Sequence, residues 1–266
     1  MSSKYIEAIA PASDTIRILF ESLKDIFTEI TLPFTKNGVV MSATNTSKNL
    51  SVYLILNKFD AYTCKETFNV SINCLYFYKM IKTCTQDDVI SFIIENSKST
   101  ELIVKCENSK TKCTNVFKIN LLDLDTIPPQ PYVSDSPEYD VMVTIPSKQF
   151  QKICKNMYHL SDTLCIETTK QQISFFCTGD YASQKTTFAY DADNKIGFNF
   201  SADNTNGKRI ISGIYDLGYL MLFNKSSNLT NSLTLFLKNN SPLVLRYGVA
   251  NLGFIYFYVS QKQTKD

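Results

Sequence analysis

A proline-dense stretch near the middle divides this chain of 266 residues into two halves. Four of the eight prolines fall within residues 121–140, at Pro128, Pro129, Pro131 and Pro137. Each proline removes a backbone hydrogen-bond donor and pushes the preceding residue into an extended conformation, so residues 127–137 can form neither a helix nor a central strand. We expect an exposed, extended connector between two domains.

The two halves carry the same order of elements, and this internal repeat constrains the fold further. Apolar residues at helical spacing predict helices over 14–28, 74–84, 147–160 and 214–225. Asp14 and Ser147 are the expected N-caps of the first and third helices. Gly218 weakens the fourth prediction by about 1 kcal/mol relative to alanine.

Short β-branched and aromatic runs, separated by polar turns, predict strands between these helices. They cover residues 38–43, 49–56, 59–64, 68–72, 89–95, 101–106, 115–122, 139–145, 163–168, 172–178, 185–190, 195–200, 208–214, 232–240, 242–248 and 253–260. A short helix with several strands therefore occurs four times, twice on each side of the prolines. Such strands favour antiparallel sheets, so the predicted fold class is α+β.

Composition narrows the class of protein. The chain is 44% hydrophobic and 20% charged, which is typical of globular proteins. It has neither an apolar run long enough to span a membrane nor an apolar N-terminal segment suited to secretion, so we expect an intracellular protein without a membrane partner. The net charge of +2 is too small to indicate nucleic-acid binding by itself.

Local charge is more informative on the predicted helix 147–160. Its apolar stripe is opposed by Lys148, Lys152, Lys155 and His159, which form one continuous basic line at helical spacing. A basic line on a single helix is usually a solvated face. The internal repeat also places lysines on the polar faces of other predicted helices, at Lys24, Lys79 and Lys82. This repetition makes contact with DNA phosphates the better interpretation.

Several motifs resemble the family of ring-shaped DNA sliding clamps typified by proliferating cell nuclear antigen. The matching segments are SLKDIF at 22–27, FDAY at 59–62, KMIK with DDVI over 79–90, LLDLD at 121–125, IPSKQFQKICK at 145–155 and SPLVLRY at 241–247. The resemblance runs over nearly the whole chain. Divergent clamps rich in asparagine and lysine occur in large DNA viruses.

The resemblance implies a clamp of two similar domains, each with two β-α-β-β-β units. Antiparallel sheets would lie outside, and four helices would line a channel. The expected boundaries are an N-terminal domain over 1–121, a connector over 122–138 and a C-terminal domain over 139–266. Three copies would close head to tail into a homotrimer around double-stranded DNA, and the protein would act as a DNA polymerase processivity factor.

The resemblance also carries functional positions onto this chain. The DNA-facing residues would be Lys24, Lys79, Lys82, Lys152, Lys155, His159 and Lys225. Edge strands at 114–119 and 185–190, with Phe117 and Phe188, would join neighbouring subunits. Lys170 falls where eukaryotic clamps carry a ubiquitin-type modification, although an exposed loop lysine is usually only soluble surface.

DNA polymerase and other replication proteins would dock short peptide motifs into an apolar pocket beneath the connector, and a clamp loader is a further expected partner. That pocket would be lined by Thr44, Lys48, Leu50, Ile127, Pro128, Pro242, Tyr258 and Ser260. Ser260 and Gln261 replace the Ala-Pro pair of common family members, so the preferred client peptide is open. The pI of about 8.0 also departs from the acidic character of eukaryotic clamps.

Other functions fit this sequence less well. The carboxylates of Asp123 and Asp125 could hold a metal, but such a pair beside a proline turn is usually solvated. His159 is the only histidine, and it has no paired nucleophile. The eight cysteines contain no C-x-x-C pair, so buried reduced thiols are expected.

We therefore expect neither an enzyme nor a cofactor. A subunit of a heterotrimeric checkpoint clamp and a monomeric DNA-binding processivity factor remain alternatives. Lysines on all four predicted helices favour the homotrimer. The site of action is expected to be the nucleus or, for a viral protein, a cytoplasmic replication site.

Overall fold

The computed structural model describes residues 4–10, 13–124, 139–201 and 210–262. The chain forms two compact units. The first contains Met1–Ala43, Tyr53–Gln130 and Gly248–Ile255, and the second contains Thr44–Val52, Pro131–Tyr247 and Tyr256–Asp266. The domain boundaries predicted from the sequence stay a prediction, as does the extended connector, because most of the proline-rich stretch lies outside the described residues.

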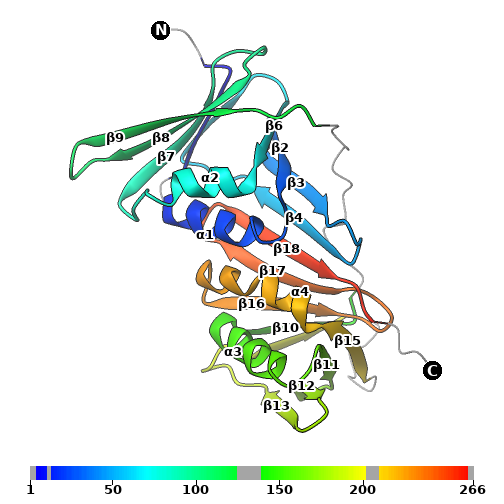
Figure 1. The fold of residues 1–266 in the computed structure, drawn as a ribbon. Helices are drawn as coiled ribbons and strands as arrows, with labels where there is room; N and C mark the ends of the chain where they lie inside the picture. Colours follow the sequence, from blue (N-terminus) through cyan, green and yellow to red (C-terminus); the bar gives the residue numbers. More distant parts are fainter. Residues whose placement is uncertain (1–3, 11–12, 125–138, 202–209, 263–266) are drawn as a thin grey trace. The chain divides into compact units, whose positions relative to one another are not determined.

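The element order repeats a β-α-β-β-β unit four times (Figure 1). The first repeat is β1 (Ile6–Ala10), α1 (Ser13–Leu23), β2 (Glu29–Thr35), β3 (Gly38–Thr44) and β4 (Leu50–Leu56). The second is β6 (Phe68–Asn73), α2 (Cys74–Ile81), β7 (Asp88–Ile94), β8 (Glu101–Asn108) and β9 (Cys113–Asn120). The short strand β5 (Ala61–Cys64) lies between them and pairs with β1.

The second half of the chain repeats this plan. Its third repeat is β10 (Val141–Pro146), α3 (Ser147–Tyr158), β11 (Thr163–Thr168), β12 (Gln172–Thr178) and β13 (Ser183–Ala189). The fourth is β15 (Ile211–Asp216), α4 (Leu217–Leu222), β16 (Ser232–Leu237), β17 (Leu243–Val249) and β18 (Gly253–Val259). The short strand β14 (Gly197–Phe200) pairs with β10 as β5 pairs with β1.

The sheets are antiparallel, as the short strands with polar turns predicted. In the first unit one sheet has the order β5-β1-β7-β8-β9, and β6, β2, β3 and β4 follow one another in a second. In the second unit the orders are β13-β12-β11-β15 and β14-β10-β16-β17. The α+β class is confirmed.

Each unit places two helices side by side against its sheets, α1 with α2 and α3 with α4 (Figure 1). Aromatic side chains join helix to helix and helix to sheet. In the first unit the Phe20 and Phe77 rings lie 4.2 Å apart, centroid to centroid. In the second, Phe150 of α3 packs edge-on against Phe175 of β12 at 5.8 Å. Burial of each such ring stabilises the fold by about 1.5–3 kcal/mol.

All four helix predictions ran past the observed ends, and the first and fourth differ most. The first helix ends at Leu23, and the chain continues in a tighter turn in which the Ile26 backbone NH donates to the Leu23 carbonyl at 3.0 Å. Phe27 still reaches the core by this route. The fourth helix starts only at Leu217, because residues 211–216 form β15, and it is followed by a 3-10 helix over Asn224–Asn228.

Two capping predictions were wrong. Asp14 lies inside α1, where its carboxylate accepts a hydrogen bond from Arg17, so it does not occupy the cap position. Ser147 is the first residue of α3 and the N-cap is Pro146. The Ser147 side chain is fully buried, and its backbone NH donates to the Asn231 carbonyl at 3.0 Å.

Strands β1 and β2 had no counterpart in the prediction. The sequence of β1, IEAIA, is rich in alanine and so lacks the β-branched and aromatic signal. Pro33 lies within β2, although proline is disfavoured inside strands because it cannot donate a backbone hydrogen bond; the β2–β3 pairing begins at Phe34, just past the proline. At Pro33 the strand pairs instead with Asn69 of β6.

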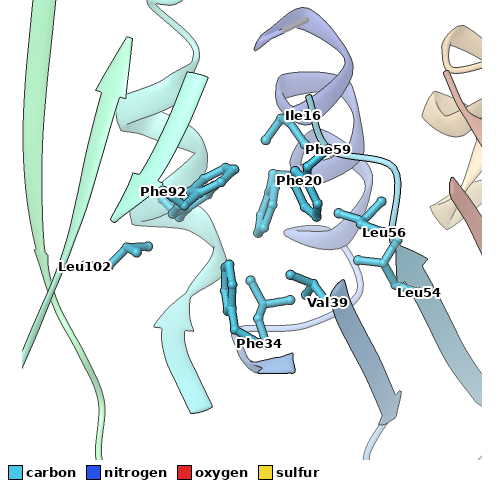
Figure 2. Close-up of a pocket in the computed structure, with 11 residues that line it drawn as sticks. Ile16, Phe20, Phe34, Val39, Leu54, Leu56, Phe59, Phe92 and Leu102 are labelled. Carbon is cyan, nitrogen blue, oxygen red and sulfur yellow. The ribbon is translucent and has the colours of Figure 1, made fainter. Parts of the chain in front are cut away.

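The core of the first unit contains a small apolar void of about 20 Å³ (Figure 2). Labelled side chains from α1, β3 and β4, with Phe34, Phe59, Phe92 and Leu102, point into it. A void this size with apolar walls is expected to stay dry. It marks imperfect packing in this unit.

Candidate nucleic-acid interface and docking surfaces

Helix α3 separates a buried apolar face from an exposed basic one. Phe150, Ile153, Cys154 and Met157 are buried. The opposite face exposes Lys148, Lys152, Lys155 and His159 to solvent, as the sequence pattern predicted. The helix is amphipathic because apolar residues recur every three or four positions, and their burial fixes the direction in which the lysines point.

Helix α2 exposes a second pair of the predicted basic residues. Lys79 and Lys82 are exposed, whereas Cys74, Phe77 and Ile81 are buried. Asn73 caps the helix by accepting a hydrogen bond from the Tyr76 backbone NH at 3.2 Å. This cap satisfies one of the donors left open at the helix start and fixes the first turn.

Lys24 has a different environment from the lysines of α2 and α3. It follows the end of α1, and its side chain is only 15% exposed. Its Nζ lies 2.6 Å from Asp25 Oδ1 and 5.2 Å from the centroid of the Tyr78 ring. The charge of Lys24 is therefore largely satisfied within the protein.

Lys225 lies in the 3-10 helix that follows α4 and is half-buried. Sequence reasoning placed it at the end of a longer helix, and this position was wrong. The N-cap of α4 is Asp216, whose carboxylate accepts hydrogen bonds from the Gly218 and Tyr219 backbone NH groups. Asp216 also pairs with Lys262 at 2.9 Å.

The two strands predicted to join subunits lie at sheet edges. β9 is the last strand of the order β5-β1-β7-β8-β9, and β13 is the first of β13-β12-β11-β15. Phe117 is opposite the buried Val104, and Phe188 is opposite the buried Ile173. Both rings are half-buried, so each strand has an apolar residue on the core-facing side of an open edge.

A hollow of about 350 Å³ lies between helix α3 and the edge strand β13. It brings together Lys152 of the basic face and Phe188 of the predicted subunit edge. Its lining residues are Gln149, Lys152, Ile153, Asn156, Gln184, Thr186 and Phe188. Sequence reasoning did not identify this hollow, because it depends on the packing of two elements far apart in the chain.

Several residues of the predicted peptide pocket lie in the second unit. The Ser260 backbone NH donates to the Asn49 carbonyl at 2.9 Å, which brings the chain end beside the loop that carries Lys48. Thr44 and Ser51 share a hydrogen bond between their hydroxyls at 2.9 Å.

Other pocket residues differ in exposure. Pro242 is exposed and Tyr258 is half-buried, but Leu50 is fully buried and offers no surface to a ligand. Ile127 and Pro128 lie outside the described residues.

A hydrogen-bonded cluster around Tyr219 was not found from the sequence. The Tyr219 hydroxyl lies 2.9 Å from Ser47 Oγ and 3.4 Å from Asn49 Nδ2. Hydrogen bonds from Ser47 and then Asn49 lower the pKa of Tyr219. The cluster connects α4 to the loop between β3 and β4, next to Lys48 and Leu50.

The remaining predicted sites concern Lys170, the cysteines and a metal ion. Lys170 is exposed in the turn between β11 and β12. All eight cysteines are free thiols, and five of them are buried, whereas Cys113 is exposed. Over the described ranges, the His, Cys, Asp and Glu side chains do not gather in groups of three or more suited to a metal ion. Within the same ranges, the helices are too short or too polar to cross a bilayer.

Comparison with known proteins agrees with the division of the chain into two similar halves. The N-terminal domain model of proliferating cell nuclear antigen matches residues 6–127, and the C-terminal domain model matches residues 133–262. The chain is 27% identical over 253 residues to the probable DNA polymerase sliding clamp 1 of Paramecium bursaria Chlorella virus 1, with 93% of each chain covered.

A second relative comes from an animal. The chain is 26% identical over 266 residues to the proliferating cell nuclear antigen of Caenorhabditis elegans, with 98% of each chain covered. The two domain models together span both halves of the repeat, one on each side of the proline-rich stretch. The chain belongs to the proliferating cell nuclear antigen family of DNA sliding clamps.

Proposed function

We propose that this protein is a DNA polymerase processivity factor that closes as a homotrimeric ring around duplex DNA. The sliding-clamp relatives support the processivity function. The observation that carries the DNA contact is the exposed basic face of α3, whose orientation is fixed by the buried opposite face. Lys79 and Lys82 on α2 give the first unit an exposed positive charge of the same kind.

Lysines on such a surface contact phosphates and read no sequence. Each neutralised phosphate adds about 0.9 to the slope of log affinity against log salt, so the contacts weaken as the salt concentration rises. Weak contacts suit a clamp, because encirclement provides retention while the protein slides. DNA-facing roles for Lys152, Lys155 and His159 follow from this arrangement, with smaller contributions from Lys24 and Lys225.

The subunit contact joins β9 of one copy to β13 of the next. Both strands have an unpaired edge, and a head-to-tail contact between different edges closes into a ring when the rotation between copies permits. The hollow between α3 and β13 would accept side chains of the neighbouring β9. Phe117 and Phe188 supply apolar surface on the two sides.

Client proteins would dock short peptides at the surface around Lys48, Pro242, Tyr258 and Ser260. The hydrogen bond from Ser260 to Asn49 supports this location because it joins the chain end to the loop after β3. Polymerase peptides are the first clients to test, and a clamp loader is a further partner.

Two alternatives differ in oligomeric state. A homotrimer of 30.2 kDa chains has a mass of about 91 kDa, whereas a checkpoint-clamp subunit or a monomeric processivity factor would not trimerise alone. Lysines after α1, on α2, on α3 and in the 3-10 helix after α4 favour the homotrimer. The role is that of a binding scaffold rather than an enzyme, acting at a nuclear or a cytoplasmic viral replication site.

A double charge reversal tests the proposed function. Lys152→Glu with Lys155→Glu should lower the length of DNA made per binding event by a polymerase that uses this clamp. A matched control carries Lys98→Glu with Lys170→Glu, two exposed turn lysines away from the helices. Circular dichroism should show both variants folded, and light scattering separates a lost DNA contact from a lost trimer, because Lys152 also lines the hollow beside β13. Wild-type processivity in the helix variant would refute the assignment of the channel.

A further inference from the structure

Helix α2 exposes an aromatic ring on the side that carries its lysines. The Tyr76 side chain is 64% exposed, and Lys79 Nζ lies 5.3 Å from the centroid of its ring. Three residues rise about 4.5 Å along a helix and complete nearly one turn, so Tyr76, Lys79 and Lys82 succeed one another along neighbouring strips of the surface. The hydrogen bond to Asn73 holds the backbone of Tyr76 in place.

The ring of Tyr76 lies largely outside the core of this helix pair. Phe77, its neighbour in sequence, fills that role by packing on Phe20. An exposed tyrosine in a lysine-rich strip instead presents a flat apolar face beside positive charge. Cation–π attraction from Lys79 adds about 0.5–1 kcal/mol at an exposed site, which favours a ring held close to the ammonium.

Helix α3 repeats this combination in the second unit. Tyr158 is its last residue and is 45% exposed. Lys155 lies one turn before it, and His159 follows directly. Aromatic rings interleaved with lysines thus occur on the exposed faces of α2 and α3, the two helices with the most exposed basic residues.

Duplex DNA can bind the lysines through its phosphates, but its bases cannot stack on the tyrosine rings. Its base faces are covered by stacking within the helix, and the lysines need only phosphates. A single strand offers both phosphates and free base faces, and protein aromatic rings bind such bases with little sequence preference. The geometry points to single-stranded DNA as a ligand of the α2 face formed by Tyr76, Lys79 and Lys82.

In this complex the Tyr76 ring stacks on an unpaired base while Lys79 and Lys82 contact flanking phosphates. The inference rests on the proposed function, in which α2 faces DNA. It goes further because it predicts that the clamp holds the unpaired strand beyond a primer end as well as duplex.

The protein allows a direct optical test because its 266 residues contain no tryptophan. Tyr76→Trp creates a single tryptophan, whose fluorescence is quenched when a base stacks on it. An oligo(dT) of about 16 nucleotides is the probe, and a duplex of the same length is the comparison. We expect quenching by oligo(dT) only. The control Tyr181→Trp, at a fully exposed turn residue, should show no quenching.

Binding measurements complete the test. In low salt, Tyr76→Ala should weaken binding of labelled oligo(dT) about 5- to 100-fold and leave duplex binding within about twofold. Tyr76→Phe keeps the ring and should bind like wild type. Equal loss of both ligands in Tyr76→Ala, or unquenched Tyr76→Trp with oligo(dT) bound, would overturn the inference.

The single-strand site and the duplex contact give different results when they are absent. Wild-type protein that binds duplex but not oligo(dT) contradicts only the single-strand site. Wild-type protein that binds neither ligand at low salt contradicts this inference and also the proposed DNA contact of the clamp.

Discussion

The Nζ of Lys24 lies 2.6 Å from Oδ1 of Asp25, and this ion pair makes Lys24 the least available of the lysines on the helices of the first unit. A lysine that is already paired gains little from a phosphate. The four repeats are therefore unequal in the charge they offer to DNA.

Salt titrations of duplex binding should reveal this inequality. Log affinity falls as log salt rises, and Lys79→Ala should make this dependence less steep by about 0.9, the value for one lost phosphate contact. Lys24→Ala should leave the slope nearly unchanged, and Asp25→Asn should increase affinity because it frees Lys24. Equal slope changes for the two lysine variants would show that the pair opens when DNA binds.

The subunit edge can be tested with two arginine substitutions on β13. Thr186→Arg places a long charged side chain in the hollow beside α3 and should convert the trimer to monomer. Ala189→Arg, exposed on the other face of the same strand, should leave the trimer intact. Light scattering at matched concentration measures both. A trimeric Thr186→Arg variant would place the subunit contact elsewhere.

Asp88 should make stability depend on pH. Burial acts to raise the pKa of this carboxyl, but hydrogen bonds from the Thr85 backbone, the Asn108 amide and the Thr85 hydroxyl outweigh burial and lower it. A lowered folded-state pKa gives stability that is present above the unfolded pKa of about 3.9 and lost as the pH falls through the folded value.

Asp88→Asn should therefore cost about 1–3 kcal/mol of unfolding free energy at pH 7 and less below about pH 4. Urea unfolding at the two pH values measures the difference. Asp87→Asn, at an exposed ion pair with Lys110, is the control and should change stability by less than about 1 kcal/mol. A cost that stays constant with pH would exclude ionised Asp88 as its source.

The void in Figure 2 predicts a stabilising substitution. Val39→Ile adds one methylene group at a wall of the void and should raise the unfolding free energy by about 0.5–1 kcal/mol. Val143→Ile, at a buried position in the second unit, serves as the comparison and should be neutral or destabilising. Loss of stability in Val39→Ile would mean that the walls cannot admit the added group.

The sequence predicted the parts of the fold that rest on local pattern. The 3.6-residue periodicity of α3 was enough to place Lys152 and Lys155 on an exposed face, and the edge position of β13 followed from the family resemblance. Strand β2 was missed because proline is disfavoured inside strands; in the structure Pro33 lies opposite Asn69 of β6, and the pairing with β3 begins one residue later, at Phe34.

The candidate site was less predictable where it depends on tertiary packing. The spacing of Lys24 gave no sign of its pairing with Asp25, and Leu50 was expected at a pocket surface but is buried. The exposure of Tyr76 and the link from Tyr219 to Ser47 involve side-chain directions that periodicity does not fix.

Retention on DNA with blocked ends tests encirclement most directly. The protein is incubated at low salt with a linear duplex carrying biotin at both ends, streptavidin is added to close the ends, and the salt is then raised to break phosphate contacts. A ring that has threaded onto the duplex should stay on the blocked DNA and leave DNA with open ends. Equal release from blocked and open DNA would contradict a clamp that encircles its substrate.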